Sequence, residues 1–476
     1  MNGSELEAVI GLEVHVQLAT RTKMFCSCPL SFGDPPNVHT CPVCLALPGA
    51  LPVLNEQAVH YGVMVGVALG CDIAERSIFA RKQYFYPDNP KAYQISQYET
   101  PLCTGGRLGE VRIHRVHLEE DAAKLVHIGH SGRIHGADAS IVDFNRGGTP
   151  LIEIVTEPDL RSAAQAGEWL RLMRSTLRQL GVSDVNMEEG SLRADANVSV
   201  RPAGSYALGT KTELKNMNSF RFLERGIDAE LRRQRELMAS GAAVEQETLH
   251  FDPQTGTLTP LRTKEEAQDY RYFPEPDLPP LEVTPAMIKR ARAELPELPA
   301  DRQRRYQEEL GLSAETARLL AFREGLGAWF ERALATGEAE PQPLANWTTQ
   351  ELAAVLAGGE PAESKVQPEA LAALVGMVAR KEVSASAGKT VLEKLAADGG
   401  EPAPIVEAEG LGAMGDGDEL DGLVQAAIDA NPDAAEKIRA GKQQAVGAII
   451  GHVMRETKGR ADGGEVSRIV REKLGV

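Results

Sequence analysis

The sequence predicts an α+β protein in which a largely antiparallel sheet domain is followed by helical domains. Three observations support this prediction. Short runs of alternating apolar and polar residues, separated by turn residues, fill residues 1 to about 290. Helical runs interrupt them without the regular strand–helix alternation of a parallel sheet. From about Thr284 onward, apolar residues recur at helical spacing instead.

The first part of the chain contains five clear strand patterns and two helical ones. We expect strands where apolar residues alternate with polar ones, and helices where the apolar spacing changes to three or four. The strands are Val9–Leu18, Ser140–Arg146, Leu151–Thr156, Ser191–Val200 and Gly209–Lys215, and the helices are Asn55–Leu69 and Arg161–Leu180.

The second part is predicted to be helical, with a Gly/Pro-rich break around Gly358–Pro361. We expect a catalytic domain over residues 1–290, a helical connector over 291–355 and a helical tail over 356–476. The predicted helices are Ala286–Glu297, Ala300–Gly311, Ala314–Thr336, Pro368–Arg380, Ser386–Asp398, Gly417–Asn431, Ala434–Val453 and Gly464–Leu474.

Composition and charge limit the function classes. The net charge of −17 argues against a protein that binds nucleic acid through its whole surface. Only the end of the tail, from Lys437 onward, is basic, which favours RNA or another anionic partner there, although a solvated helix face remains the alternative. We find no apolar stretch that would cross a bilayer and no export signal in Met1–Ala8, so we expect a cytoplasmic protein.

Four clustered cysteines predict a metal site. Cys26 and Cys28 form one closely spaced pair, and Cys41 and Cys44 form a second pair twelve residues later. Four thiolates around one ion are the usual ligand set of structural zinc, and a reducing compartment favours zinc over disulfides. We therefore expect a zinc loop, with the remaining cysteines as small buried side chains.

Polar residues share one face of three predicted strands. Glu13 and His15 lie on one face of the first strand, and Arg193 and Asp195 on one face of a later strand. Carboxylates with a histidine hold Mg²⁺, and cations neutralise phosphates. A solvent-exposed sheet face would explain one such strand, but three strands with this mixture of residues favour a binding site for metal and phosphate. The third strand carries Lys211, Glu213 and Lys215.

Two further segments leave alternatives open. Residues 111–124 concentrate His117, Glu119, Glu120 and Asp121, but the alternation breaks down, so the pattern does not show which carboxylate points inward, and a surface acid cluster remains possible. The aromatic run in residues 81–97 fits either base stacking or a loop anchor. A P-loop is not supported at residues 386–390, because Val383 stands where the motif needs glycine.

Eight long runs resemble the B subunits of the tRNA-dependent amidotransferases. They cover nearly the whole chain, more weakly in the tail. The runs are VIGLEVHVQL (9–18), CPVCLALPGALPVLN (41–55), YFYPDNPKAYQISQY (84–98), HLEEDAAK (117–124), DFNRGGTPLIEIVTEPD (143–159), MEEGSLRADANVSV (187–200), ELKNMNSF (213–220) and DYRYFPEPDLPPL (269–281).

The resemblance implies a first domain similar to glutamine synthetase, which binds ATP without a P-loop. It implies a heterotrimer with an amidase (A) subunit and a small C subunit. With ATP and Mg²⁺, such an enzyme phosphorylates the side-chain carboxylate of Glu-tRNA(Gln) or Asp-tRNA(Asn), and ammonia from the amidase displaces the phosphate. The helical tail is implied to contact tRNA. The competing hypothesis is a noncatalytic tRNA-binding scaffold, which would bind no nucleotide.

The resemblance also assigns candidate site residues. Glu13, His15 and Glu120 are the first candidates for metal ligands or catalytic groups, followed by Glu213 and Lys215. The four cysteines are not universal in the family, so zinc is expected to be structural. A zinc hydrolase is disfavoured because a complete Cys₄ shell leaves no position for water. Weaker candidates for nucleotide binding are Arg193, Asp195 and Asn216.

Overall fold

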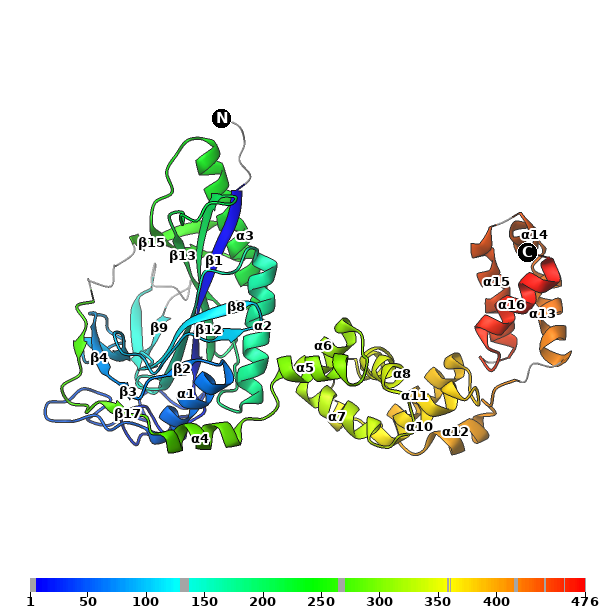
Figure 1. Ribbon diagram of the computed structural model, residues 1–476, viewed down its shortest axis with the longest axis horizontal. Helices are drawn as coiled ribbons and strands as arrows, with labels where there is room; N and C mark the ends of the chain where they lie inside the picture. The colour runs from blue at the N-terminus through cyan, green and yellow to red at the C-terminus, as the bar shows by residue number, and fades with distance from the viewer. Residues whose placement is uncertain are drawn as a thin grey trace. The chain divides into compact units, whose positions relative to one another are not determined.

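The computed structural model describes residues 6–128, 137–263, 270–357, 359, 361–414, 418–440, 442–457 and 459–475. The chain divides into two compact units, Met1–Pro299 and Ala300–Val476. The first unit is a sheet with helices and the second is helical (Figure 1), which confirms the predicted α+β class. Our three-part domain division stays a prediction. Among the described residues, no helix is long and apolar enough to cross a membrane.

A ten-stranded sheet organises the first unit, in the order β15-β14-β13-β12-β1-β11-β8-β6-β2, with β7 paired to β8. The pairings are antiparallel except for β13 with β14. Its strands are β1 (Leu6–Gln17), β2 (Asp72–Ile73), β6 (Cys103–Thr104), β7 (Arg107–Leu108), β8 (Val111–Glu120), β11 (Pro150–Thr156), β12 (Leu192–Pro202), β13 (Thr212–Met217), β14 (Glu247–Phe251) and β15 (Leu258–Thr263).

Three smaller sheets accompany the large one. The three-stranded sheet has the order β16-β4-β5, and the two-stranded sheets are β10-β9 and β17-β3. Their strands are β3 (Arg76–Ser77), β4 (Phe79–Gln83), β5 (Tyr93–Gln97), β9 (Lys124–Ile128), β10 (Ala139–Asp143), β16 (Phe273–Pro274) and β17 (Leu281–Glu282).

One face of the large sheet is apolar and packs against helices. Ile10, Leu12, Val14 and Val16 of β1 are buried in one core with apolar residues of the helices. The alternation in β1 therefore directs its polar residues to the opposite face. The helices of this unit are α1 (Glu56–Ala68), α2 (Ala163–Gln179), α3 (Phe220–Ala239) and α4 (Pro285–Glu294). Of these, α3 was not predicted from the sequence.

The second unit contains two hydrophobic cores. Residues from the stretch Tyr306 to Leu411 form the first core, and residues from the stretch Leu420 to Leu474 form the second. Two long predicted helices are each broken. The chain leaves helical geometry at Arg323 (φ −110°, ψ 89°), which divides 314–336 into α6 and α7. A 3₁₀ turn at Gln443–Ala445 likewise separates α14 from α15.

The helical elements of this unit are short. They are α5 (Pro299–Glu308), α6 (Ala314–Phe322), α7 (Glu324–Leu334), α8 (Pro341–Asn346), a π-helical turn Trp347–Leu352, α9 (Ala353–Leu356), a 3₁₀ turn Pro361–Glu363, α10 (Pro368–Ala379), α11 (Ala385–Asp398), α12 (Pro402–Glu409), α13 (Asp418–Ala430), α14 (Pro432–Arg439), α15 (Val446–Glu456) and α16 (Gly463–Leu474).

Candidate active site and metal centres

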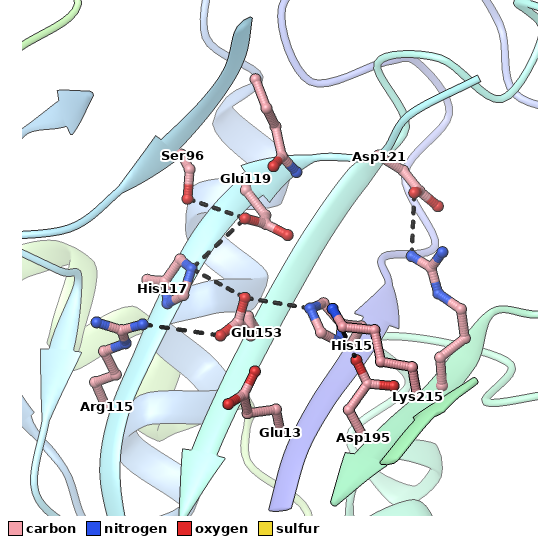
Figure 2. Close-up of polar contacts among 12 residues, drawn as sticks. Glu13, His15, Ser96, Arg115, His117, Glu119, Asp121, Glu153, Asp195 and Lys215 are labelled. Carbon is pink, nitrogen blue, oxygen red and sulfur yellow. Dashed lines mark hydrogen bonds and ion pairs between the residues drawn. The ribbon is translucent and has the colours of Figure 1, made fainter. Parts of the chain in front are cut away.

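The sheet register places polar side chains of four strands in one row. β1 lies between β12 and β11, and β11 lies next to β8. His15 is opposite Arg193 on one side and Glu153 on the other, and Glu153 is opposite His117. Because directly paired residues point to the same face of a sheet, these side chains converge above it (Figure 2).

A β-bulge explains why the pattern of residues 111–124 was ambiguous. Val155 pairs with Arg115, but the next residue, Thr156, pairs with Ile113, so one residue of β8 is extra. A bulge of this kind reverses the alternation along the strand. Arg115, His117 and Glu119 therefore share the polar face, and Glu119 is the carboxylate that points into the site.

Two histidines and two carboxylates form the centre of the site. His15 Nε2 lies 3.2 Å from Glu153 Oε2, and His117 Nε2 lies 3.5 Å from the same oxygen. His117 Nε2 is also 3.6 Å from Glu119 Oε2, which accepts a hydrogen bond of 2.9 Å from Ser96 Oγ. His15, Glu119 and Glu153 each offer one ligand atom, and these atoms all lie within 4.8 Å of one another. We call these three residues the carboxylate cluster.

Electrostatics keep both carboxylates ionised. Burial disfavours a charged Glu153, but the charges of His117 and His15 outweigh it and hold the pKa of Glu153 well below its usual range. Burial also opposes the charge on Glu119, yet the hydrogen bond and charge of His117 lower its pKa. Burial opposes a charged His15 as well, but Glu153 raises the pKa of His15 to about 9.

The carboxylate cluster fits a divalent cation. Its two buried carboxylates are already ionised, and a bound cation would offset their negative charge. His117 is buried, and its Nδ1 has no hydrogen-bond partner among the described residues. The donor set of two carboxylates and an imidazole suits Mg²⁺ or Mn²⁺ better than a soft metal.

Cationic side chains border the carboxylates. Lys215 Nζ lies 3.7 Å from Asp195 Oδ2 and 3.6 Å from Glu213 Oε1. Arg193 Nη2 lies 3.1 Å from Asp121 Oδ1. Burial opposes the charge of Lys215 and of Arg193, but the adjacent carboxylates raise the pKa of each. Both side chains therefore stay positively charged at neutral pH, as the binding of phosphate groups requires.

The structure brings together some predicted residues and separates others. Glu13 shares the polar face, and its Oε1 accepts a hydrogen bond of 2.8 Å from Asn197 Nδ2. Glu120 does not join the carboxylate cluster, because its Oε1 pairs with Lys91 and accepts a hydrogen bond of 3.0 Å from Ile95 N. Asn216 lies in β13, but its side chain falls outside what the structure describes.

Glu153 was missed from the sequence. It is the single charged residue of β11, between Ile152 and Ile154, which are fully buried. A lone carboxylate inside an apolar strand is an available indication, because burying an unpaired charge is costly and implies a partner. Its partners come from β1 and β8, and only the register reveals them.

The four cysteines form the second cluster. Their sulfur atoms all lie within 4.8 Å of one another, with Cys41–Cys44 at 3.8 Å and Cys28–Cys44 at 4.0 Å. All four are free thiols. A zinc ion with bonds of about 2.3 Å at the centre of a tetrahedron sets its sulfurs about 3.8 Å apart. The predicted cysteine cluster is thus confirmed, and it fits zinc.

Comparisons with known proteins agree with this geometry. Residues 8–289 match the family model of the GatB/GatE catalytic domain, and residues 328–474 match that of the GatB domain. The sheet unit with its polar face is therefore the catalytic domain of an amidotransferase.

The relatives narrow the family further. The B subunit of an aspartyl/glutamyl-tRNA(Asn/Gln) amidotransferase from Anaeromyxobacter sp. (strain K) is 50% identical over 99% of both chains. The proteins of the same name from Thermus thermophilus and Persephonella marina are 48% and 45% identical, over 99% of this chain and 99% and 100% of the relatives. The chain belongs to this family, the B subunits of the tRNA-dependent amidotransferases, which confirms the resemblance seen in its sequence.

Proposed function

We propose that the polar sheet face activates the side-chain carboxylate of Glu-tRNA(Gln) or Asp-tRNA(Asn) with ATP. A carboxylate oxygen attacks the γ-phosphorus, ADP leaves, and an acyl phosphate forms. Ammonia then attacks the acyl carbon and expels inorganic phosphate, leaving the amide. The carboxylate must be activated in this way before ammonia attacks, because a carboxylate is a poor electrophile until it carries a leaving group.

The observation that carries the proposal is the convergence of His15, Glu119 and Glu153 within 4.8 Å on the polar face. These residues would hold Mg²⁺, which supplies charge neutralisation to the phosphates of ATP. Both carboxylates are buried, which supports a site with limited access for the water that would hydrolyse an acyl phosphate.

The flanking side chains orient the phosphates. Arg193 and Lys215 border the carboxylate cluster and stay charged at neutral pH. Asp121, which is buried, fixes the Arg193 guanidinium at 3.1 Å and accepts a hydrogen bond of 2.7 Å from Gln17 Nε2. Positioned cations stabilise the charge that spreads over a transferring phosphoryl group. Asp195 and Glu213 hold Lys215 in place.

The proposed reaction also implies protein and tRNA partners. The proposed reaction needs an ammonia source, and we place it in an amidase subunit of a heterotrimer that also contains a small C subunit. We assign tRNA contact to the helical tail, whose last helices carry Lys437, Arg439, Arg455 and Arg471. We expect the assembly to work in the cytoplasm, where aminoacyl-tRNA is used.

The test uses the assembled enzyme with Glu-tRNA(Gln), ATP and ammonium chloride as nitrogen donor. Glu153→Gln removes the charge that contacts both histidines, so we expect tRNA-dependent ATP hydrolysis and amide formation to fall about 10²–10³-fold. The tRNA affinity should be unchanged. The control is Glu157→Gln, just beyond the end of β11, whose carboxylate pairs with the exposed His114 outside the carboxylate cluster.

A noncatalytic scaffold gives different results. It would show no heat of binding when Mg²⁺ and ADP are titrated into the wild-type assembly, and Glu153→Gln would then change nothing. Nucleotide binding that is weakened by Glu153→Gln and unaffected by Glu157→Gln supports the catalytic role.

A further inference from the structure

Two cationic side chains beside the carboxylate cluster have donor atoms without an acceptor. Lys82 of β4 makes no hydrogen bond or ion pair among the described residues, and its Nζ lies 4.8 Å from the centre of the Tyr270 ring. The Nε atom of Arg115 in β8 is buried and has no hydrogen-bond partner in the described part of the chain. Withdrawing a cation from water is costly unless its donors find acceptors, so these unused donors indicate a site for an anion.

The small sheet of β16, β4 and β5 directs Lys82 towards the carboxylate cluster. Lys82 is opposite Gln94, which lies two residues before Ser96, so Lys82 and Ser96 share one face of this sheet. The Ser96 hydroxyl donates to Glu119 Oε2 at 2.9 Å, so this face is turned to the cluster. Burial opposes the charge of Lys82, but Tyr272 and the carboxylates of the cluster outweigh it and raise the pKa of Lys82. Lys82 is therefore a cation at neutral pH.

Three tyrosine rings join Lys82 to Arg115. Tyr98 and Tyr272 are stacked, with ring centres 4.3 Å apart and ring planes inclined by 9°, and Tyr270 meets Tyr272 edge to face at 6.1 Å. The Arg115 guanidinium lies 5.8 Å from the centre of the Tyr98 ring. All three rings are half-buried, so they offer apolar surface beside the two cations. We call these five residues the Lys82 subsite.

The Lys82 subsite and the cations assigned to the phosphates of ATP lie on opposite sides of the carboxylate cluster. Arg115 belongs to β8 and Lys215 to β13, and β12, β1 and β11 lie between these strands. Figure 2 shows Arg115 and Lys215 on either side of Glu153 and His15, and Arg115 Nη2 lies 3.9 Å from Glu153 Oε1. In an in-line phosphoryl transfer the attacking and leaving oxygens lie on opposite sides of the phosphorus. The attacking group is therefore expected on the side of Arg115.

The chemistry of the Lys82 subsite suits a short carboxylate better than a second polyphosphate. A glutamyl or aspartyl side chain carries one negative charge on a stem of methylene groups. Ammonium and guanidinium groups donate strong hydrogen bonds to a carboxylate, and tyrosine rings contact the methylene groups. A polyphosphate carries several charges and needs metal ions and more cations than the two found here. Pairing the carboxylate with cations also reduces its repulsion from the phosphates of ATP.

We propose that Lys82 and Arg115 bind the side-chain carboxylate of the amino acid esterified to tRNA, which is the group that ATP phosphorylates. The inference rests on the proposed function, because it names the subsite that holds the nucleophile of that reaction. The two cations bind one oxygen of the carboxylate, and the other oxygen is free to attack the γ-phosphorus. The neutral amide of the product pairs with these cations more weakly, so the same contacts favour release of the product.

The test compares the affinity of the assembled enzyme for Glu-tRNA(Gln) and for Gln-tRNA(Gln), which differ in a carboxylate and an amide. Mg²⁺ and a non-hydrolysable ATP analogue are present, so no phosphorylation occurs. We expect the wild type to prefer Glu-tRNA(Gln) by about tenfold or more, as for a hydrogen bond to a charged group. Lys82→Met keeps an apolar stem without the charge and should reduce this preference to within about twofold. Lys82→Arg keeps the charge and should retain most of it.

The matched control is Lys289→Met, which removes the same charge from an exposed position of α4 in the same unit and should keep the full preference. Arg115→Met should lower the preference as Lys82→Met does, and it supplies an independent measurement if Lys82→Met does not fold.

Four results would overturn the proposal. The first is a wild type without a preference, and the second is an unchanged preference in Lys82→Met or Arg115→Met. The third is an equal loss of affinity for both tRNAs in Lys82→Met, which would indicate a contact with the body of the tRNA. The fourth is weakened binding of Mg²⁺ and ADP in Lys82→Met, which would identify Lys82 as a nucleotide ligand.

A kinetic assay separates this inference from the proposed function. With ammonium chloride as nitrogen donor, Lys82→Met should lower kcat/KM for tRNA-dependent ATP hydrolysis about 10²-fold and leave the affinity for Mg²⁺ and ADP within about twofold of the wild type. A wild-type enzyme that prefers Glu-tRNA(Gln) but hydrolyses no ATP would contradict the proposed function alone. A wild-type enzyme that forms the amide, together with a Lys82→Met variant of equal activity, would contradict this inference alone.

Discussion

The sheet unit contains two groups of side chains that could hold a metal ion, and the two groups are built in opposite ways. The four cysteines come from one short loop and are close in the sequence. The carboxylate cluster comes from β1, β8 and β11, and only the strand register brings its members together. The first is therefore a local feature of the chain, and the second is a consequence of the complete fold.

The two clusters also differ in the number of coordination positions that they would leave free on a bound metal. Four thiolates complete the tetrahedral shell of zinc, so the cysteine cluster has no position for a substrate. Mg²⁺ is octahedral and prefers oxygen ligands, so the three residues of the carboxylate cluster would leave coordination positions for water and phosphate. A closed site holds a loop in shape, whereas an open one binds a reactant.

The largest expected effect is the loss of metal or nucleotide binding at one cluster without loss at the other. Cys41→Ser should reduce the zinc content from about one per chain to almost none, because three thiolates hold zinc far more weakly than four. Its affinity for Mg²⁺ and ADP should stay within about threefold of the wild type. Glu153→Gln should show the reverse, with full zinc and weakened nucleotide binding. Elemental analysis and calorimetry measure the two quantities on the same preparations.

The control for this comparison is Cys71→Ser, a half-buried cysteine outside the cluster. It should keep both zinc and nucleotide binding. If Cys41→Ser lost nucleotide binding as strongly as Glu153→Gln does, the two clusters would form one functional unit and the distinction between them would be lost.

A smaller effect concerns the ion pair beside the carboxylate cluster. The Asp121 side chain is 4% exposed and contacts Arg193 at 3.1 Å. Arg193→Met leaves this carboxylate with hydrogen bonds from Gln17 and from the backbone N of Ala122, and with Arg146 at 3.8 Å. We expect a loss of about 2 kcal/mol in the free energy of unfolding at pH 7, less than for a fully unpaired buried charge. Urea unfolding measures it.

The pH dependence of that loss has a defined sign. Burial opposes the charge on Asp121, but Arg193 and Arg146 outweigh it and lower its pKa. A lowered pKa stabilises the folded state above the unfolded value of about 3.9, and the stabilisation disappears as the pH falls through the folded value. The difference between Arg193→Met and wild type should therefore narrow in acid. Arg112→Met, which breaks the exposed pair with Asp159, should cost less at every pH.

The sequence predicted what was local and missed what depended on register. Alternation in residues 9–18 correctly placed Glu13 and His15 opposite the apolar core, and the cysteine spacing predicted the cluster that the structure contains. The extra residue in β8 made it impossible to choose between Glu119 and Glu120 by pattern. Glu153 was overlooked because nothing within β11 shows that two histidines lie across from it.

The smallest predicted difference tests which carboxylates belong to the carboxylate cluster. Glu119→Gln removes one of its three ligands and should lower kcat/KM for tRNA-dependent ATP hydrolysis by at least about 100-fold. Glu13→Gln should lower it only about tenfold, because the Glu13 carboxylate is held by Asn197 and its amide replacement keeps a similar hydrogen bond. Steady-state kinetics at saturating Mg²⁺ compares the two variants.

Equal losses in these two variants would restore the expectation drawn from the sequence, in which Glu13 binds the metal with His15. Asn197→Ala then gives a further distinction. If Glu13 only supports the polar face, releasing it from Asn197 should cost at least as much activity as Glu13→Gln, because Glu13→Gln keeps a similar hydrogen bond and Asn197→Ala removes it. If Glu13 is a metal ligand in the nucleotide complex, its release should leave the activity unchanged or raise it, because the carboxylate would be freer to reach the metal.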